Sequence, residues 1–436
     1  MKSEIERIYR EKVMSADDAA KIIKSGDKIF LGCGASTPLT IGEAIGRRDG
    51  ELEDVLIVSA FLREPMKIVN GTGSSFLNHT YFMGVQERVM NRAGLGDYTS
   101  MHLSESDLYF SKIVKPNIAV FDVTPPDEEG NMNLGAAGIC LGKHAIANAD
   151  TIICQVNKNE PWIFGTDNVI NVKDVDIIVE SDRELSVYPP LEENEETASV
   201  AEYILDMIPD GSTVQFGIGG VSNAVGLGLK KKNDLGGYTE LMTDTMMELM
   251  ELGVVNNRYN TYLSGKTAAA FALGTEKLYK YLDHNEKICF MPFTEINNPV
   301  NVAKNDNMIS INTALQVDLF GQVNADNKSG DQFSATGGQL DFVRGAQMSK
   351  NGKSFIAMTS HYVHKGKVGS RIVAKLPEGT AVTTPRSDVQ YLVTEYGCVN
   401  LKELSMRDRV RAIIELAAPE YRDELRESAR EMKMYR

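Results

Sequence analysis

The chain has 436 residues, of which 42% are hydrophobic and 24% charged, a composition typical of globular proteins with two or three domains. Its formal net charge is -14, and the basic residues form no stripe, so we expect no binding to nucleic acid. The longest apolar runs, such as residues 55–62, are far shorter than the ~20 residues of a membrane span, so we expect no membrane insertion.

The first residues, MKSEIERIYREKV, are charged and lack the apolar core and cleavage site of a secretory signal. The five cysteines form no CxxC pair, which suits reduced thiols and makes structural zinc unexpected. We therefore predict a cytoplasmic protein. The one close pair of histidines, His361 and His364 in HYVH, lies between two apparent strands, and we interpret it as a polar loop rather than a metal site.

In chain order, the first half contains four β-branched apolar runs that predict buried strands, at residues 28–34, 55–60, 118–123 and 151–156. They show almost no polar alternation, as expected when helices cover both faces of a parallel sheet. Ser15, with Asp18 three residues later, predicts the start of a helix before the first of these strands. The first half is therefore predicted to be α/β.

The stretch SVYPPLEENEETAS, with two prolines followed by glutamates, is the best candidate for a linker. Beyond it, five further runs predict strands, at residues 213–219, 287–293, 308–315, 354–360 and 391–397. Ser405, with Asp408 three residues later, predicts the start of the last helix. We predict an N-terminal α/β domain over residues 1–188 and a C-terminal α/β domain over residues 189–436.

The two halves also resemble one another. Glycines recur in both at offsets of 185 or 191 positions: Gly32 with Gly217, Gly34 with Gly219, and Gly130 with Gly321. We infer a pseudo-duplicated protein of two α/β domains, with the active site expected at their interface.

Each glycine repeat follows a predicted strand and precedes a predicted helix, a context typical of turns that bind phosphate. The dinucleotide fingerprint fails, however, because both GCGAST and GIGGVS lack its third glycine. The segment LSGKTAAAF includes Lys266 and resembles the end of a P-loop, but Asn260 occupies the position of the first required glycine. Ser222 lies between a predicted strand and a predicted helix, as a serine hydrolase nucleophile does, but its surrounding pattern is Gly-x-Ser-x-Ala. We therefore interpret it as a helix N-cap.

Polar or small residues stand at several predicted strand ends of the second half, where ligands bind in open α/β sheets. They are Glu240 in YTELMTD, Asn297 in TEINNPVNV, Gly337 and Gly338 in SATGGQLDF, and Glu395 in VTEYG. Together with FGIGGVSNAV and INTALQVDLFGQVNAD, these motifs resemble the acetyl-CoA hydrolase/transferase family of class I CoA-transferases. The resemblance runs nearly end to end, and it implies the same pair of similar α/β domains.

The resemblance implies that Glu240 is the nucleophile of a ping-pong reaction. Its carboxylate would attack a butyryl-, 4-hydroxybutyryl- or similar acyl-CoA, form an acyl-glutamyl anhydride, and then hold CoA as a glutamyl thioester until a carboxylate such as acetate accepts it. By motif position, the backbones of Ile218 and Gly338 are the expected oxyanion donors. Asn297 is expected to contact the reacting thioester or CoA, and Glu395 to orient the nucleophile.

The same motifs imply further contacts with substrate or CoA, at Gly217, Gly219, Gly220, Gly337 and Gln339. Because CoA is polyanionic and the chain is acidic, we also expect a local basic patch, with Lys266 as a contributor. No tightly bound cofactor and no metal are expected, since CoA serves as substrate and covalent intermediate. The family implies a homodimer.

Two alternatives remain open at this point. An acyl-CoA hydrolase would use the same glutamate but transfer the acyl group to water, and a non-catalytic acyl-CoA-binding module would keep the glycine loops without needing Glu240. Glu395 is the second candidate nucleophile, because TEYG is as conspicuous as TELM. Without the resemblance, Asn297 would be interpreted as a turn residue before Pro299.

Overall fold

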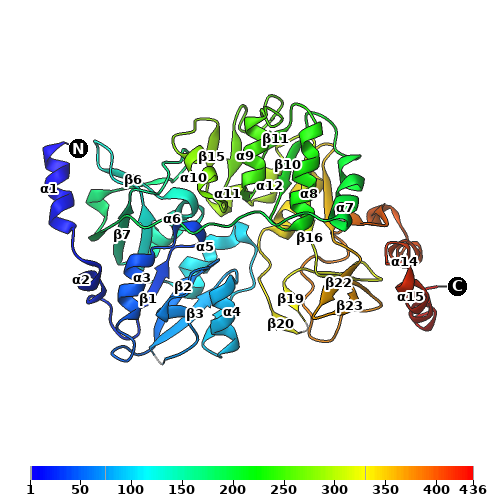
Figure 1. Cartoon of the computed structure of the whole chain (residues 1–436), viewed down its shortest axis with the longest axis horizontal. Helices are drawn as coiled ribbons and strands as arrows, with labels where there is room; N and C mark the ends of the chain where they lie inside the picture. Colours follow the sequence, from blue (N-terminus) through cyan, green and yellow to red (C-terminus); the bar gives the residue numbers. More distant parts are fainter. Residues whose placement is uncertain (1, 74, 329, 436) are drawn as a thin grey trace. The chain divides into compact units, whose positions relative to one another are not determined.

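The computed structural model describes residues 2–73, 75–328 and 330–435. The chain divides into two compact units, which are both mixed α/β (Figure 1). Unit 1 consists of Met1–Pro189 and Ala268–Ile296, and unit 2 of Pro190–Thr267 and Asn297–Arg436. The segment Ala268–Ile296, which the sequence assigned to the C-terminal domain, therefore packs with unit 1.

A seven-stranded parallel sheet forms the centre of unit 1, in the order β4-β3-β2-β1-β5-β7-β9. Every residue of β5 is buried, which explains why this strand shows no polar alternation. The four predicted strands of the first half are all present. The strands are β1 (Lys28–Leu31), β2 (Val55–Ser59), β3 (Phe76–Thr80), β4 (Gly96–Tyr98), β5 (Ile118–Val123), β7 (Thr151–Asn157) and β9 (Ile177–Ser181).

The helices of unit 1 pack around an apolar core that the sheet strands share with α2 and α3. As predicted, Ser15 caps the helix before β1, because its Oγ accepts a hydrogen bond from the backbone N–H of Asp18 at 3.1 Å. The helices are α1 (Ser3–Lys12), α2 (Ala16–Ala20), α3 (Leu39–Gly46), α4 (Val85–Arg92), α5 (Ser106–Leu108) and α6 (Gly135–Asn148), and β6 (Asn131–Asn133) pairs with β8 (Val169–Asn171).

Backbone hydrogen bonds hold the later segment of unit 1 in place. The N–H of Phe290 donates to the carbonyl of Phe164 at 2.8 Å, and the N–H of Tyr188 donates to the carbonyl of Gly274 at 2.8 Å. The predicted strand at residues 287–293 therefore exists but belongs to unit 1. This segment contains α10 (Glu276–Leu282), β15 (Ile288–Phe290) and α11 (Phe293–Ile296).

Unit 2 has a six-stranded sheet in the order β11-β10-β16-β21-β25-β26, parallel except for the last pair. If β10 is matched to β1, then β11, β16, β21 and β25 match β2, β5, β7 and β9 in the same order, which supports the predicted duplication. The strands are β10 (Thr213–Phe216), β11 (Gly236–Gly237), β16 (Met308–Thr313), β21 (Lys353–Ala357), β25 (Tyr391–Thr394) and β26 (Gly397–Asn400).

The turns at Gly130 and Gly321 provide independent support for the duplication. Both glycines have a left-handed backbone, with φ of 86° and 84°. Three residues before each, Asp127 or Asp318 uses its Oδ1 to accept hydrogen bonds from the backbone N–H groups two and four residues later, at 2.8–3.0 Å. The same turn chemistry thus follows the equivalent strands β5 and β16.

The helices of unit 2 begin within the predicted linker and continue to the end of the chain. Asn194 caps α7, and Ser405 caps α14 as predicted, but α15 follows, so the last helix begins later than expected. No described helix is long and apolar enough to span a membrane. The helices are α7 (Glu195–Leu205), α8 (Gly220–Gly228), α9 (Asp244–Glu251), α12 (Pro299–Val302), α13 (Gln339–Met348), α14 (Met406–Glu415) and α15 (Pro419–Glu431).

Two local predictions in unit 2 are wrong. HYVH is not a loop but β22 (His361–His364), which forms an antiparallel hairpin with β23 (Lys367–Ser370). Ser222 does not cap a helix: it is buried inside α8, whose N-cap is Gly219, because only glycine readily adopts the φ of 122° found there. The remaining short strands are β12 (Leu241–Met242), β13 (Thr267–Ala269), β14 (Phe271–Ala272), β17 (Gln316–Asp318), β18 (Val323–Asn324), β19 (Asn327–Lys328), β20 (Asp331–Gln332) and β24 (Ile372–Val373).

Candidate active site

Glu240 lies just beyond β11, at the carboxyl end of a strand at the edge of the unit 2 sheet. A Cβ atom on Gly236 would overlap Asn260 Oδ1, and one on Gly237 would lie 2.7 Å from Thr267 Cγ2, so only glycine allows β11 to pack this closely. The glycine pair therefore serves packing. Glu240 follows this glycine pair at the carboxyl end of β11. In parallel sheets, binding sites form at the carboxyl ends of the strands.

The structure brings Glu240 together with two other predicted site residues. Asn297 Nδ2 donates a 2.6 Å hydrogen bond to Glu240 Oε2. A Cβ atom on Gly338 would overlap both that oxygen and Asn297 Nδ2, so only glycine fits there. Three positions that are far apart in the sequence thus meet at one carboxyl oxygen.

The surroundings of Glu240 favour its neutral form. Its pKa is raised from 4.5 to about 7, chiefly because burial penalises the charged carboxylate. The hydrogen bond from Asn297 lowers this pKa, and the nearby charge of Asp341 raises it. A carboxyl group with a pKa near neutrality is poised to ionise under ordinary conditions, and the functional site of an enzyme is where such shifts concentrate.

Asn297 is fully buried, and its side-chain oxygen has no hydrogen-bond partner among the described residues. Its amide nitrogen donates its hydrogen bond to Glu240. A buried acceptor without a partner is costly, which makes this oxygen a place where a donor group of a bound molecule would be favoured. Asn297 therefore does more than form the turn before Pro299.

A glycine-rich loop joins β10 to the N-terminus of α8. Cβ atoms on Gly217 and Gly219 would meet nothing within 4 Å, whereas one on Gly220 would lie 3.3 Å from Thr197 Cγ2. Ile218 is 55% exposed. The loop backbone is therefore open at two of its three glycines, next to a helix N-terminus whose dipole favours anions.

The two predicted oxyanion donors share one property. In the part of the chain that the structure describes, neither the backbone N–H of Ile218 nor that of Gly338 makes a hydrogen bond. Gly338 is the N-cap of α13, and Gly337 before it has a φ of 61°. Both donors are thus unused, although their role in binding an oxyanion stays a prediction.

Two other predicted contact residues are placed differently. The side-chain amide of Gln339 is bound at both ends, since its Nε2 donates to the Thr313 carbonyl at 2.9 Å and its Oε1 accepts from Thr384 Oγ1 at 2.9 Å. It fixes the loop before α13 to the end of β16. Lys266 is exposed and makes no hydrogen bond to Glu240, Asn297 or Gly338.

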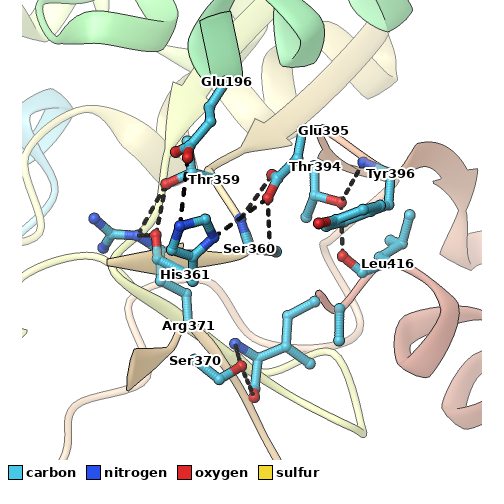
Figure 2. A network of polar contacts seen from close by, with 12 residues as sticks. Glu196, Thr359, Ser360, His361, Ser370, Arg371, Thr394, Glu395, Tyr396 and Leu416 are labelled. Carbon is cyan, nitrogen blue, oxygen red and sulfur yellow. Dashed lines mark hydrogen bonds and ion pairs between the residues drawn. The ribbon is translucent and has the colours of Figure 1, made fainter. Parts of the chain in front are cut away.

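Glu395 belongs to a second polar cluster (Figure 2). Its Oε2 accepts a hydrogen bond from the backbone N–H of Ser360 at 2.8 Å, and its Oε1 accepts from Ser360 Oγ at 2.5 Å. His361 lies between two carboxylates, with Nδ1 3.7 Å from Glu395 Oε1 and Nε2 3.4 Å from Glu196 Oε1. The contacts of Glu395 are therefore different from those of Glu240.

Sequence reasoning missed several residues of these clusters. Asp341 could have been noticed within the GGQLD motif, because it lies one helical turn after Gly338. Ser360 and His361 lie three and four residues after the end of the strand at residues 353–357, close to the position where polar site residues of parallel sheets occur. Nothing in the sequence indicated that Thr384 holds Gln339, since they are 45 positions apart.

Comparison with known protein families gives matches over most of the chain. The acetyl-CoA hydrolase/transferase N-terminal domain matches residues 1–188, and the C-terminal domain of the same family matches residues 274–429. The first of these regions contains the unit 1 sheet, and the second contains Asn297, Gly338 and Glu395.

Individual relatives are similar over nearly their whole lengths. The 4-hydroxybutyrate coenzyme A transferase of Clostridium kluyveri is 37% identical, over 97% of this chain and 98% of its own. The butyryl-CoA:acetate CoA-transferase of Anaerostipes caccae is 34% identical, over 98% of both. Among solved structures, RipA from Yersinia pestis superposes with a TM-score of 0.90 at 33% identity, covering 99% of each chain.

Proposed function

This chain belongs to the acetyl-CoA hydrolase/transferase family, and from that premise we propose that it moves CoA from a short-chain acyl-CoA to a carboxylate through a covalent intermediate on Glu240. The enzyme class, CoA-transferase, follows from relatives of that name at 34–37% identity over nearly the whole chain. The names of these relatives favour butyryl or 4-hydroxybutyryl as the acyl group, with acetate as one acceptor.

The observation that supports Glu240 as the nucleophile is its shared contact with Asn297 and Gly338. In the proposed first step, the Glu240 carboxylate attacks the thioester carbonyl, the C–S bond breaks, and CoA leaves as a thiolate, giving an acyl-glutamyl anhydride. The thiolate then attacks the glutamyl carbonyl of the anhydride. The original acid leaves as a carboxylate, and a glutamyl-CoA thioester remains.

The second half of the reaction reverses these steps with a different acid. The acceptor carboxylate attacks the glutamyl thioester and releases the thiolate, which then attacks the acceptor's own carbonyl in the new anhydride. Glu240 is regenerated as a carboxylate, so atoms and charge balance over the cycle. Each tetrahedral intermediate places negative charge on one oxygen, and the unused N–H groups of Ile218 and Gly338 are the donors that we propose for it.

Replacement of the nucleophile tests this proposal. We expect Glu240→Gln to lower acetate-dependent conversion of butyryl-CoA to acetyl-CoA by at least about a thousandfold, because an amide cannot form the anhydride. Glu202→Gln, an exposed change on α7, is the matched control. Exchange by Glu240→Gln at the control rate would contradict the proposal.

Two further measurements separate the alternatives. Borohydride reduction after incubation with butyryl-CoA should modify the peptide at residues 238–244, and modification at Glu395 instead would make that residue the nucleophile. An acyl-CoA hydrolase would release free thiol at the same rate without acetate, whereas a transferase requires the acceptor. Gel filtration would test the homodimer, which together with the cytoplasmic location stays a prediction.

A further inference from the structure

Unit 2 contains an open pocket of about 330 Å³ whose role the mechanism above leaves unassigned. The described residues that line it are Leu315, Gln316, Asn327, Lys328, Tyr362, Val363, His364 and Arg371. They come from β17, β19 and β22, with Leu315 directly before β17 and Arg371 directly after β23. Its volume is within the range of pockets that bind small molecules.

The lining of this pocket is positive. The two charged side chains among its described lining residues, Lys328 and Arg371, are both cations, the lining also includes His364, and no carboxylate is among these residues. In the described part of the chain, neither Lys328 nor Arg371 forms an ion pair; instead Lys328 Nζ lies 5.4 Å from the centre of the Phe333 ring, and the Arg371 guanidinium lies 5.7 Å from that of Tyr362. Unpaired cations gathered at one pocket are notable in a chain with net charge -14.

Arg371 is held in a defined orientation. Its Nε donates to the His361 carbonyl at 3.2 Å, and its Nη1 donates to the Leu315 carbonyl at 3.2 Å, while its Nη2 makes no hydrogen bond among the described residues (Figure 2 shows its bonds to Thr359 and His361). Arg371 feels the charge of Glu395 but forms no ion pair with it at contact distance, and a guanidinium with unused donors is suited to a phosphate oxygen.

A pocket of unit 1 provides a contrast. It is of similar size, about 370 Å³, but its charged lining is dominated by carboxylates: Glu160, Glu184, Glu276 and Asp283, against Lys158 and Lys280. A polyanion would be repelled there. Size alone therefore does not distinguish the two pockets, whereas charge does.

A chain of contacts connects the positive pocket to Glu240. Gly338 abuts the Glu240 carboxyl group, and its neighbour Gln339 donates a hydrogen bond to the Thr313 carbonyl at the end of β16. Leu315, two residues after Thr313, lines the pocket. The loop before α13 thus contacts both the Glu240 carboxyl group and the carboxyl end of β16, and the pocket begins two residues beyond that end.

We propose that this pocket binds the phosphate-bearing adenosine end of coenzyme A, with Lys328 and Arg371 as the positive contacts and His364 as a hydrogen-bond donor. The proposal rests on the proposed function, in which CoA is the group transferred. Among the described residues, the Glu240 site provides no positive charge for the phosphates of CoA, and the pocket would provide it. The exposed ring of Tyr362 offers a surface for the base. Lys266, expected from sequence to contribute to a basic patch, is not part of this pocket.

Calorimetric titration of the full-length protein with CoA, and separately with pantetheine, tests the assignment without requiring turnover. We expect Lys328→Gln to weaken CoA binding about tenfold and Lys328→Glu to weaken it further, because a charged phosphate contact is lost or replaced by repulsion. Pantetheine, which lacks the phosphates, should bind all variants equally. Lys402→Gln removes the same charge from another exposed site of unit 2 and should leave the CoA affinity unchanged.

The outcomes separate the two proposals. CoA affinity unchanged in both Lys328 variants, or an equal loss for CoA and pantetheine, would overturn the pocket assignment even if the protein exchanged acyl groups normally. Binding of CoA that depends on Lys328 in a protein that exchanges no acyl groups would support the pocket and refute the transferase mechanism. Added salt should weaken CoA binding more in the unaltered protein than in Lys328→Gln.

Discussion

At the scale of single residues, Asn297 and Gly338 set the environment of the Glu240 carboxyl group. Gly338 leaves the space that the carboxyl oxygen fills, and Asn297 donates the hydrogen bond that partly offsets the cost of burying a charge. The balance between the burial cost and this hydrogen bond matters for the proposed nucleophile. Glu240 must be ionised to attack, but an anion that is stabilised too strongly attacks poorly.

The rate of exchange should therefore depend on pH in a defined direction. Because the pKa of Glu240 is about 7, we expect kcat/KM to rise with pH up to about 7 and to level off above it, as the carboxylate form becomes dominant. Asn297→Ala removes a hydrogen bond that lowers this pKa, so the midpoint should move to higher pH. Exchange rates between pH 5 and 9 would measure both; a flat profile in the unaltered protein would contradict the assignment.

At the scale of elements, the strand-loop-helix from β10 to α8 presents an open backbone. Its φ of 122° at Gly219 requires glycine, and the N–H of Ile218 just before it is unused. The exposed Ile218 side chain is not needed to hold the loop, because most of its surface faces solvent. The function of this loop is therefore expected to lie in its N–H groups.

Substitutions at Ile218 can separate backbone from side chain. Ile218→Pro removes the N–H, and loss of one oxyanion donor typically lowers kcat by about a hundredfold to a thousandfold. Ile218→Ala keeps the N–H, so its kcat should fall far less than that of Ile218→Pro. The measurement is kcat for butyryl-CoA with acetate, with thermal unfolding as a check on the fold. Equal losses in the two variants would assign the effect to the side chain.

At the scale of the whole molecule, buried carboxyl groups link stability to pH. Burial is the main cause that raises the pKa of Glu240, Glu87 and Asp122, each to about 7. A group whose pKa is higher folded than unfolded binds more protons when folded, so stability falls as pH rises from the unfolded pKa through the folded one. Both units contain such groups, since Glu87 and Asp122 belong to unit 1 and Glu240 to unit 2.

We therefore expect urea unfolding to show lower stability at pH 7.5 than at pH 5. Because Glu240→Gln cannot ionise, its loss of stability between pH 5 and pH 7.5 should be smaller than that of the unaltered protein, by about 2 kcal/mol for a pKa raised from 4.5 to about 7. If this variant and the unaltered protein lost equal stability, folding would not raise the pKa of Glu240.

The α/β class, the duplication and most strands of both sheets can be predicted from the sequence alone. Apolar β-branched runs such as residues 118–123 can be identified without a structure, because a strand covered on both faces is apolar at most positions, with the buried Asp122 as the exception in this run. The paired turns at Gly130 and Gly321 were likewise visible, since their left-handed backbone demands a particular residue type. The family motifs indicated Glu240, Asn297 and Gly338 as candidate site residues.

Which residues meet becomes visible only in the folded chain. The contact of Glu240 with Asn297 joins positions 57 residues apart, and the packing of Ala268–Ile296 with unit 1 depends on hydrogen bonds from distant strands and loops. HYVH became a hairpin strand because it pairs with residues 367–370. Such outcomes follow from long-range contacts, which local sequence patterns do not encode, and the positive pocket around Lys328 arises in the same way.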